Sequence, residues 1–118
     1  AAQAIRLLNQ EPCHRDAMFR LLQSLFRAQE MRAVANEIEH FENTCGSALP
    51  EGRSLQLRAL VSLSDFEPAV GVADALIAEN RASPKAWAAR ADVYEKTGKL
   101  KEASRDLRQA LALFPDGQ

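Results

Sequence analysis

Hydrophobic and polar positions alternate with a helical period in the last third of the chain. One apolar stripe consists of Trp87, Ala91 and Tyr94. A second stripe follows Gly98 and consists of Leu100, Ala103, Leu107, Ala110 and Leu111. Both stripes follow the i, i+3, i+4, i+7 spacing that places side chains on one face of an amphipathic helix. The pattern therefore predicts a helical hairpin with helices over residues 84–97 and 101–114.

Start and stop signals support these boundaries. Ser83 followed by Pro84 is typical of a helix N-cap and first helical position. Gly98 can adopt the left-handed conformation that ends a helix, and Pro115 is expected to stop the second helix. The residues that begin and end each helix of the hairpin are thus ones whose backbone preferences favour a helix boundary.

The same pattern recurs earlier at a period of 34 or 35 residues. Phe66–Ala69 corresponds to Leu100–Ala103, and Pro50 corresponds to Pro84. One step further back, two stripes are formed by Met18, Leu21, Leu22, Leu25 and by Met31, Val34, Ile38, Phe41. An extra residue in the segment ENTCGSALP accounts for the longer step. A final stripe of Ala4, Leu7 and Leu8 predicts that residues 1–12 are the second helix of a preceding hairpin, before repeats at 15–49, 50–83 and 84–117.

The last hairpin resembles a known repeat family. Trp87-x2-Arg90-Ala91-x2-Tyr94, Ala103-x3-Leu107 and Pro115 are similar to the tetratricopeptide repeat (TPR) pattern W-x2-L-G-x2-Y, A-x3-F and P. The resemblance implies an all-α, right-handed TPR-type α-solenoid of about seven helices, in which each hairpin buries its apolar face against the next. Arg90 replaces the usual Leu, so we expect this position to be more solvated than in a typical repeat, or covered by a group outside the segment.

The repeat pattern also bears on the ends of the segment. Solenoids need polar capping elements, and we see none before the first stripe or after Pro115. We therefore expect a segment excised from a longer protein, with end surfaces that can self-associate.

The TPR resemblance implies a binding groove lined by the first helix of each hairpin. Residues on these helices outside the apolar stripes include two phenylalanines and three arginines, a composition typical of interaction hot spots. In the alternative interpretation, the phenylalanines pack against the preceding helix. The candidate groove residues are Phe19, Arg20, Gln23, Phe26, Arg27, Leu55, Arg58, Lys85 and Asp92.

The two cysteines lie at neighbouring ends of one predicted hairpin. Cys13 precedes its first helix and Cys45 follows its second, so a disulfide is geometrically possible. The alternative is a pair of free, partly buried thiols. His14 and His40 lie near these cysteines, but the spacing of the four residues does not match common zinc sites. We expect ordinary surface histidines.

Composition excludes several other functions. A net charge of −1 and a pI near 6.2 argue against nucleic-acid binding, and no apolar run is long enough to span a bilayer. No catalytic, phosphate-binding or calcium-binding motif is present, so we expect no enzyme, cofactor or metal. Acidic residues concentrate within residues 37–80, where they form either a solvated face or a surface that attracts a cationic partner.

The composition and pattern of the sequence also suggest a second resemblance. The segment HRDAMFRLLQSLFRAQEMRAVANEIEHF, with its many Ala, Leu and Arg residues, resembles the periplasmic TPR regions of PelB-type outer-membrane exopolysaccharide export proteins. That resemblance implies a periplasmic scaffold that docks a polysaccharide-modifying enzyme. Two alternatives are a TPR-like regulatory domain of a bacterial transcriptional activator, which would be cytoplasmic, and a secretion chaperone.

Overall fold

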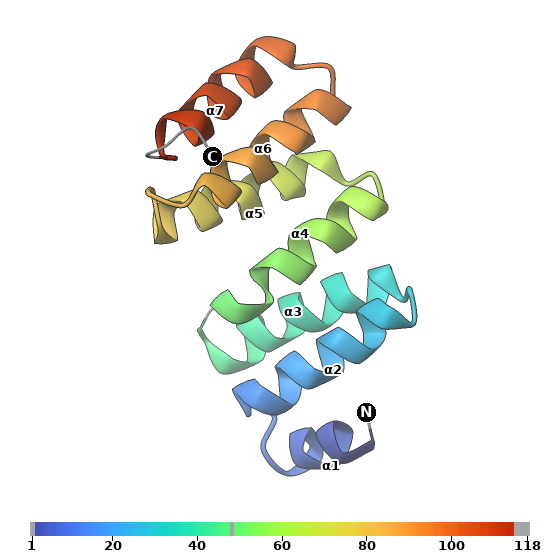
Figure 1. The fold of residues 1–118 in the computed structure, drawn as a ribbon. Coiled ribbons are helices and arrows are strands. Elements are labelled where there is room, and N and C mark those ends of the chain that lie inside the picture. The colour runs from blue at the N-terminus through green and yellow to red at the C-terminus, as the bar shows by residue number, and fades with distance from the viewer. Residues whose placement is uncertain (1, 48, 115–118) are drawn as a thin grey trace. The chain divides into compact units, whose positions relative to one another are not determined.

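The computed structural model describes residues 2–47 and 49–114, and within them the chain is helical without strands. Pro115 and the predicted end of the last repeat at residue 117 lie outside this part. The last two helices begin and end within two residues of their predicted bounds. The elements, shown in Figure 1, are α1 (Ala2–Gln10), α2 (Arg15–Arg27), α3 (Met31–Cys45), the short 3-10 helix η1 (Pro50–Gly52), α4 (Arg53–Ser62), α5 (Phe66–Glu79), α6 (Pro84–Lys96) and α7 (Leu100–Ala112).

The chain divides into two compact units, residues 1–64 and 65–118. The core of the first unit comes from α2, α3, α4 and the loop before η1. Leu49 in that loop is fully buried, although no periodic pattern marked it. A Cβ on Gly52 would lie 3.1 Å from Leu49 Cδ2 and 3.2 Å from Leu22 Cδ1, so glycine permits this close packing. The core residues are Met18, Leu22, Val34, Ile38, Phe41, Leu49 and Ala59.

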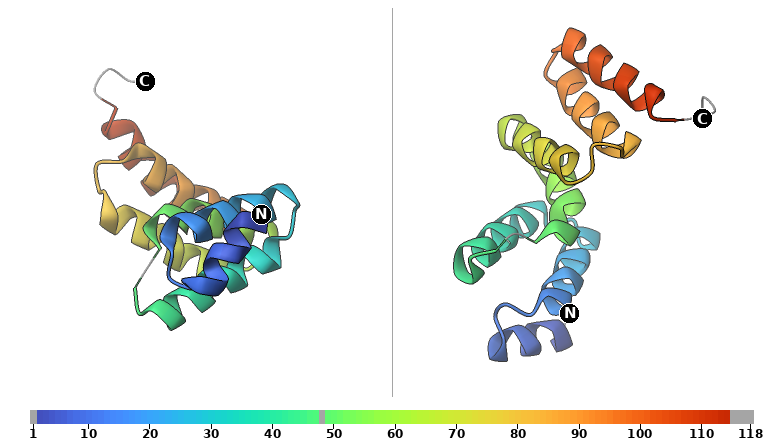
Figure 2. Two further views of the ribbon diagram at one scale, coloured as in Figure 1. Left: turned by 90° about the horizontal axis from the view of Figure 1, so that it is seen from below. Right: turned by 90° about the vertical axis from the view of Figure 1, so that its left-hand side faces the viewer.

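The second unit contains α5, α6 and α7, and α6 packs against both of its neighbours. Figure 2 shows α6 and α7 as an antiparallel pair. Ala91 on α6 and Ala103 on α7 are buried, and these small side chains let the two helices approach closely. Ser83 caps α6 by accepting a hydrogen bond from the backbone N–H of Ala86. The sequence signals of this hairpin therefore have the expected structural roles.

Only part of the predicted stripe on α7 is buried. Ala103 and Ala110 face α6, whereas Leu100, Leu107 and Leu111 are 65%, 40% and 62% exposed. Successive helical residues are rotated by about 100°, so a stripe this wide extends beyond the flank that one neighbouring helix covers. A row of apolar side chains therefore remains on the surface of α7.

The three hairpin turns share one backbone feature. Gln29, Ser64 and Gly98 have φ values of 61°, 60° and 79°, and they occupy equivalent turns 35 and 34 positions apart. The left-handed backbone conformation is unfavourable for residues with a side chain, and of these three turns only the last has glycine at this position. The repeat is thus preserved in the backbone where the sequence signature is lost. None of the described helices is long and apolar enough to span a membrane.

Candidate functional site

Five of the nine candidate groove residues line one shallow pocket in the first unit. The pocket has a volume of about 470 Å³ and is bounded by α2, the turn after it, the start of α3 and α4. We call it the α2–α4 pocket. Its lining residues are Gln23, Phe26, Arg27, Gln29, Met31, Leu55 and Arg58.

The pocket combines an aromatic ring with cationic groups. The guanidinium Cζ of Arg58 lies 4.4 Å from the centroid of the Phe26 ring, within the range of a cation–π interaction. Phe26 is half-buried and packs against the core, while Arg58 and Arg27 are exposed. A cationic rim over an apolar floor can accept a carboxylate next to an apolar or aromatic side chain.

The other four candidate residues lie elsewhere. Phe19 is half-buried on α2 and does not line the pocket. Arg20 is exposed and forms an ion pair with Asp16, with 3.2 Å between Arg20 Nε and Asp16 Oδ2. Lys85 and Asp92 are exposed residues of α6, in the second unit.

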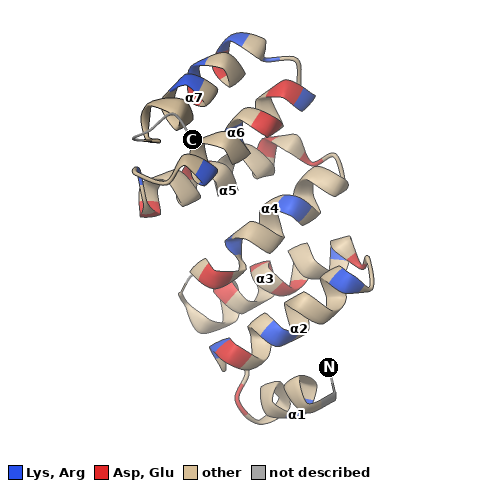
Figure 3. Ribbon diagram, in the orientation of Figure 1, with Lys and Arg blue, Asp and Glu red and all other residues tan. Residues whose placement is uncertain are grey.

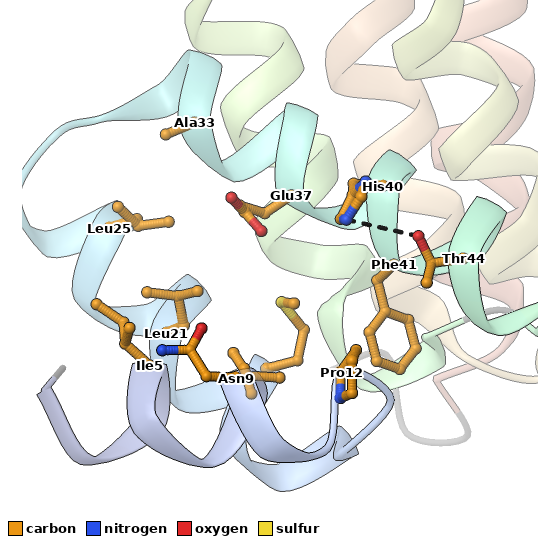
Figure 4. Close-up of a pocket in the computed structure, with 12 residues that line it drawn as sticks. Ile5, Asn9, Pro12, Leu21, Leu25, Ala33, Glu37, His40, Phe41 and Thr44 are labelled. Atoms are coloured by element: carbon orange, nitrogen blue, oxygen red, sulfur yellow. Dashed lines mark hydrogen bonds between the residues drawn. The ribbon is translucent and has the colours of Figure 1, made fainter.

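The sequence did not indicate a second pocket, which lies among α1, α2 and α3 (Figure 4). Its volume is about 450 Å³. Apolar residues of the predicted stripes, such as Leu21 and Leu25, line it because α1 leaves part of α2 and α3 uncovered. Polar side chains that line the same pocket are Asn9, Glu37, His40 and Thr44. Only the position of α1 reveals this pocket, so no sequence signal could have located it.

A disulfide joins Cys13 to Cys45, with 5.6 Å between their Cα atoms. It links the start of α2 to the end of α3, so these thiols are not free. The histidines nearby have local partners: His14 Nδ1 accepts a hydrogen bond from the Ala17 N–H at 3.1 Å, and His40 Nε2 lies 3.5 Å from the hydroxyl of Thr44. Across the described residues, no group of three His, Cys, Asp or Glu side chains is placed to hold a metal ion.

Arg90 lies at the centre of a polar network that was not predicted from the sequence. Its Nε and Nη2 donate to Asp106 Oδ2 and Oδ1 at 2.7 and 2.8 Å, and its Nη1 donates to Asp74 Oδ1 at 2.8 Å. The guanidinium also lies 5.1 Å from the centroid of the Trp87 ring and 5.7 Å from that of Tyr94.

The network explains why an arginine replaces the usual leucine. The side chain of Asp106 is only 3% exposed, and such a buried carboxylate needs a charged partner. Its hydrogen bonds raise the pKa of Arg90 above the ordinary value, against the opposing effect of burial. Arg90 is 21% exposed, and the groups that cover it belong to this chain. The position is thus partly solvated, as expected, and the contacts of Arg90 come from this chain rather than from a group outside the segment. The signal in the sequence was the aspartate at position 106, inside an otherwise apolar helix face.

Comparison with known proteins supports the helical-repeat fold. The tetratricopeptide repeat family model matches residues 84–116. A comparison with curated protein sequences gave no match. Among solved structures, "Crystal structure of MamA" is 15% identical, covers 95% of this chain and has a TM-score of 0.82. "MamA RS-1 ArsTM double mutant" is 12% identical over 96% with a TM-score of 0.84, and "MamA MSR-1 C2" is 17% identical over 98% with a TM-score of 0.79.

The chain spans 65%, 63% and 66% of the lengths of these three chains. At such low identity the similarity concerns the fold, and it extends over nearly the whole sequence rather than the last repeat alone. Helical repeats of this kind present surfaces for binding other proteins. Residues 84–116 match the tetratricopeptide repeat family model, and the chain has the all-α, TPR-type solenoid fold.

Proposed function

We propose that this chain is a non-catalytic protein-interaction scaffold that holds a partner side chain in the α2–α4 pocket. The observation that carries the proposal is the position of Arg58 over Phe26, with Arg27 lining the same pocket. Arginine and aromatic residues dominate the energetics of protein interfaces, because they combine a large contact area with directed polar contacts. The partner contributes an acidic residue beside an apolar or aromatic one.

The biological setting we propose is a bacterial exopolysaccharide export apparatus. In this setting the chain is the periplasmic part of an outer-membrane protein, and its partner is a periplasmic polysaccharide-modifying enzyme. The resemblance to PelB-type TPR regions supports this assignment. The Cys13–Cys45 disulfide supports it too, because disulfides persist in oxidising compartments such as the periplasm. The same observation disfavours the cytoplasmic alternative, a regulatory domain of a transcriptional activator. A secretion chaperone is favoured by no specific observation.

The pocket is tested by binding measurements with the proposed partner enzyme. Arg58→Glu replaces the cation over Phe26 with an anion, and we expect at least a roughly 30-fold loss of affinity, the magnitude of an interface hot spot. Arg20→Glu is the matched control, since Arg20 is an exposed arginine on α2 outside the pocket. Equal affinities of the two variants for the enzyme would contradict the proposed role of the pocket.

The compartment is tested separately by thiol labelling in cells. In the periplasm, Cys13 and Cys45 should resist alkylation until a reductant is added. Ready labelling of both thiols in freshly lysed cells would contradict a periplasmic location.

A further inference from the structure

The polar network around Arg90 has an equivalent place in the first unit. Helices α1, α2 and α3 correspond to α5, α6 and α7, as equivalent backbone features show. The left-handed turn residues Gln29 and Gly98 are 69 positions apart. So are His14 and Ser83, whose side chains cap α2 and α6 in the same way. This register allows the two sets of three helices to be compared residue by residue.

At this register, all five residues of the network correspond to residues that line the pocket among α1, α2 and α3. We call it the α1–α3 pocket. Asp74, Trp87, Arg90, Tyr94 and Asp106 correspond to Ile5, Met18, Leu21, Leu25 and Glu37, in that order. The two aromatic rings and the arginine are thus replaced by a methionine and two leucines, whose smaller side chains leave a volume of about 450 Å³.

The carboxylate of the network is retained in the α1–α3 pocket, but its cation is not. Asp106 accepts hydrogen bonds of 2.7 and 2.8 Å from Arg90, whereas the counterpart of Arg90 next to Glu37 is Leu21. Within the described residues, no hydrogen bond or ion pair involves the carboxylate of Glu37. Figure 4 shows this carboxylate directed into the space that Leu21 and Asn9 border. The α1–α3 pocket therefore has the acceptor of the network and room for a donor.

We propose that the α1–α3 pocket binds an arginine side chain of a partner protein, in the place that Arg90 occupies in the second unit. The guanidinium donates to both carboxylate oxygens of Glu37, as Arg90 does to Asp106. Glutamate is longer than aspartate by a methylene, so its carboxylate extends further from α3 to meet a donor that comes from outside. The aliphatic part of the bound arginine packs on Leu21.

Charge favours a cation over a purely apolar occupant. Of the described residues that line the α1–α3 pocket, Glu37 alone is an Asp, Glu, Lys or Arg, and an apolar group would desolvate its carboxylate without compensation. Helix α3 carries Glu37, Glu39 and Glu42 against a single basic residue, Arg32. Figure 3 shows the acidic positions of this helix in red. An acidic helix raises the local concentration of cationic groups.

The site is defined by three helices and is separate from the α2–α4 pocket. Among the described residues, the polar and ring contacts of Arg90 come from α5, α6 and α7, so the equivalent place is bounded by α1, α2 and α3. The α1–α3 and α2–α4 pockets share no lining residue. The Arg58→Glu experiment therefore does not bear on this inference.

The test uses three capped tripeptides that carry arginine, citrulline or lysine between two glycines. Binding to the isotopically labelled chain is followed by NMR, through the backbone amide signals around Glu37 and the side-chain amide of Asn9. We expect the arginine peptide to shift these signals at millimolar concentration. Citrulline has the same shape without the charge and should bind at least about tenfold more weakly. Lysine should bind at least about threefold more weakly, because an ammonium lacks the paired donors of a guanidinium.

A matched pair of variants separates the pocket from general attraction. Glu37→Gln should weaken the arginine peptide at least about tenfold. Glu39→Gln changes the net charge equally at an exposed position of α3 outside the pocket, and it should leave the affinity unchanged. Equal losses in the two variants would overturn the inference. Equal binding of the arginine peptide and either of the other peptides, or no shift at millimolar peptide, would overturn it as well.

A variant of Leu21 tests the equivalence with the second unit directly. Leu21→Arg supplies the missing guanidinium from within the chain, so it should weaken the arginine peptide at least about tenfold by occupying its place. It should also melt at a higher temperature when Glu37 is intact than in combination with Glu37→Gln. Undiminished peptide binding by a folded Leu21→Arg chain would show that the peptide does not take the place of Arg90. The Glu37 and Glu39 variants still decide the inference if Leu21→Arg fails to fold.

Discussion

Replacement of Arg90 by leucine, the residue usual in the TPR pattern, should destabilise the second unit strongly. The substitution removes both hydrogen bonds to Asp106, of 2.7 and 2.8 Å, and leaves a carboxylate with 3% exposure without its cation. It also removes the contacts with the Trp87 and Tyr94 rings. A change toward the family consensus is thus expected to be harmful in this chain.

The magnitude follows from the burial of Asp106. Removal of one partner of a buried ion pair costs about 3–5 kcal/mol, because the remaining charge stays desolvated. A unit of about 50 residues has a free energy of unfolding of roughly 3–8 kcal/mol, so the expected loss is a large part of the stability of this unit. The double variant R90L/D106L should recover most of the loss, since apolar residues that replace a whole buried pair are often neutral or stabilising. Asp74→Asn should cost less than about 1 kcal/mol, because Asp74 is 53% exposed.

Urea denaturation measures these free energies of unfolding. Far-UV circular dichroism reports on all helices, and the fluorescence of Trp87, the single tryptophan, reports on the second unit. A loss below about 1 kcal/mol in R90L, or a double variant as unstable as the single one, would refute the reasoning.

Further substitutions test other features of the fold. Reduction of the Cys13–Cys45 disulfide should lower the free energy of unfolding by about 3–4 kcal/mol, the loop-closure value for its 32-residue separation. Denaturation curves recorded with and without dithiothreitol measure this loss, and identical curves would contradict the prediction. Gly98→Ala should lower the free energy of unfolding by about 1–2 kcal/mol, because alanine is strained at a φ of 79°. Gln29→Gly, at the equivalent turn position, should raise it by up to about 1 kcal/mol. Changes of the opposite sign in thermal melts would show that backbone strain does not decide the stability of these turns. Ala103→Leu should cost about 1–3 kcal/mol by overpacking the α6–α7 crossing, and an unchanged melting temperature would show that the crossing is loosely packed.

The helical hairpins were predictable because their signals are local. Ser83, Pro84 and Gly98 act within one helical turn, and the spacing of buried residues such as Ile38 and Phe41 follows from helix geometry alone. The TPR-type fold implied by the resemblance of the last hairpin is confirmed by the family match to that repeat and by the similarity to the MamA structures.

The candidate groove was only partly accessible to the same reasoning. Helical spacing places Phe26 and Arg58 outside the buried stripes. It does not say that α2 and α4 bring the cation within 4.4 Å of the ring centroid. Nor does it separate these residues from Phe19 and Arg20, which lie on the same helix outside the pocket. Whether the pocket binds a partner stays a prediction.

Arg90 shows most clearly what depends on long-range contacts. The sequence shows that Arg90 replaces the leucine usual at this position of the TPR pattern. The physical reason for the replacement is Asp106, 16 residues away, which is buried where α6 and α7 cross. The choice between a disulfide and free thiols at Cys13 and Cys45 likewise depended on how α2 and α3 pack. The sequence by itself determined the helices, their repeat and the turn at Gly98, because their signals are local to each helix and its ends. Only the tertiary structure decided which polar groups pair and which apolar residues remain exposed, because burial depends on neighbours that are distant along the chain.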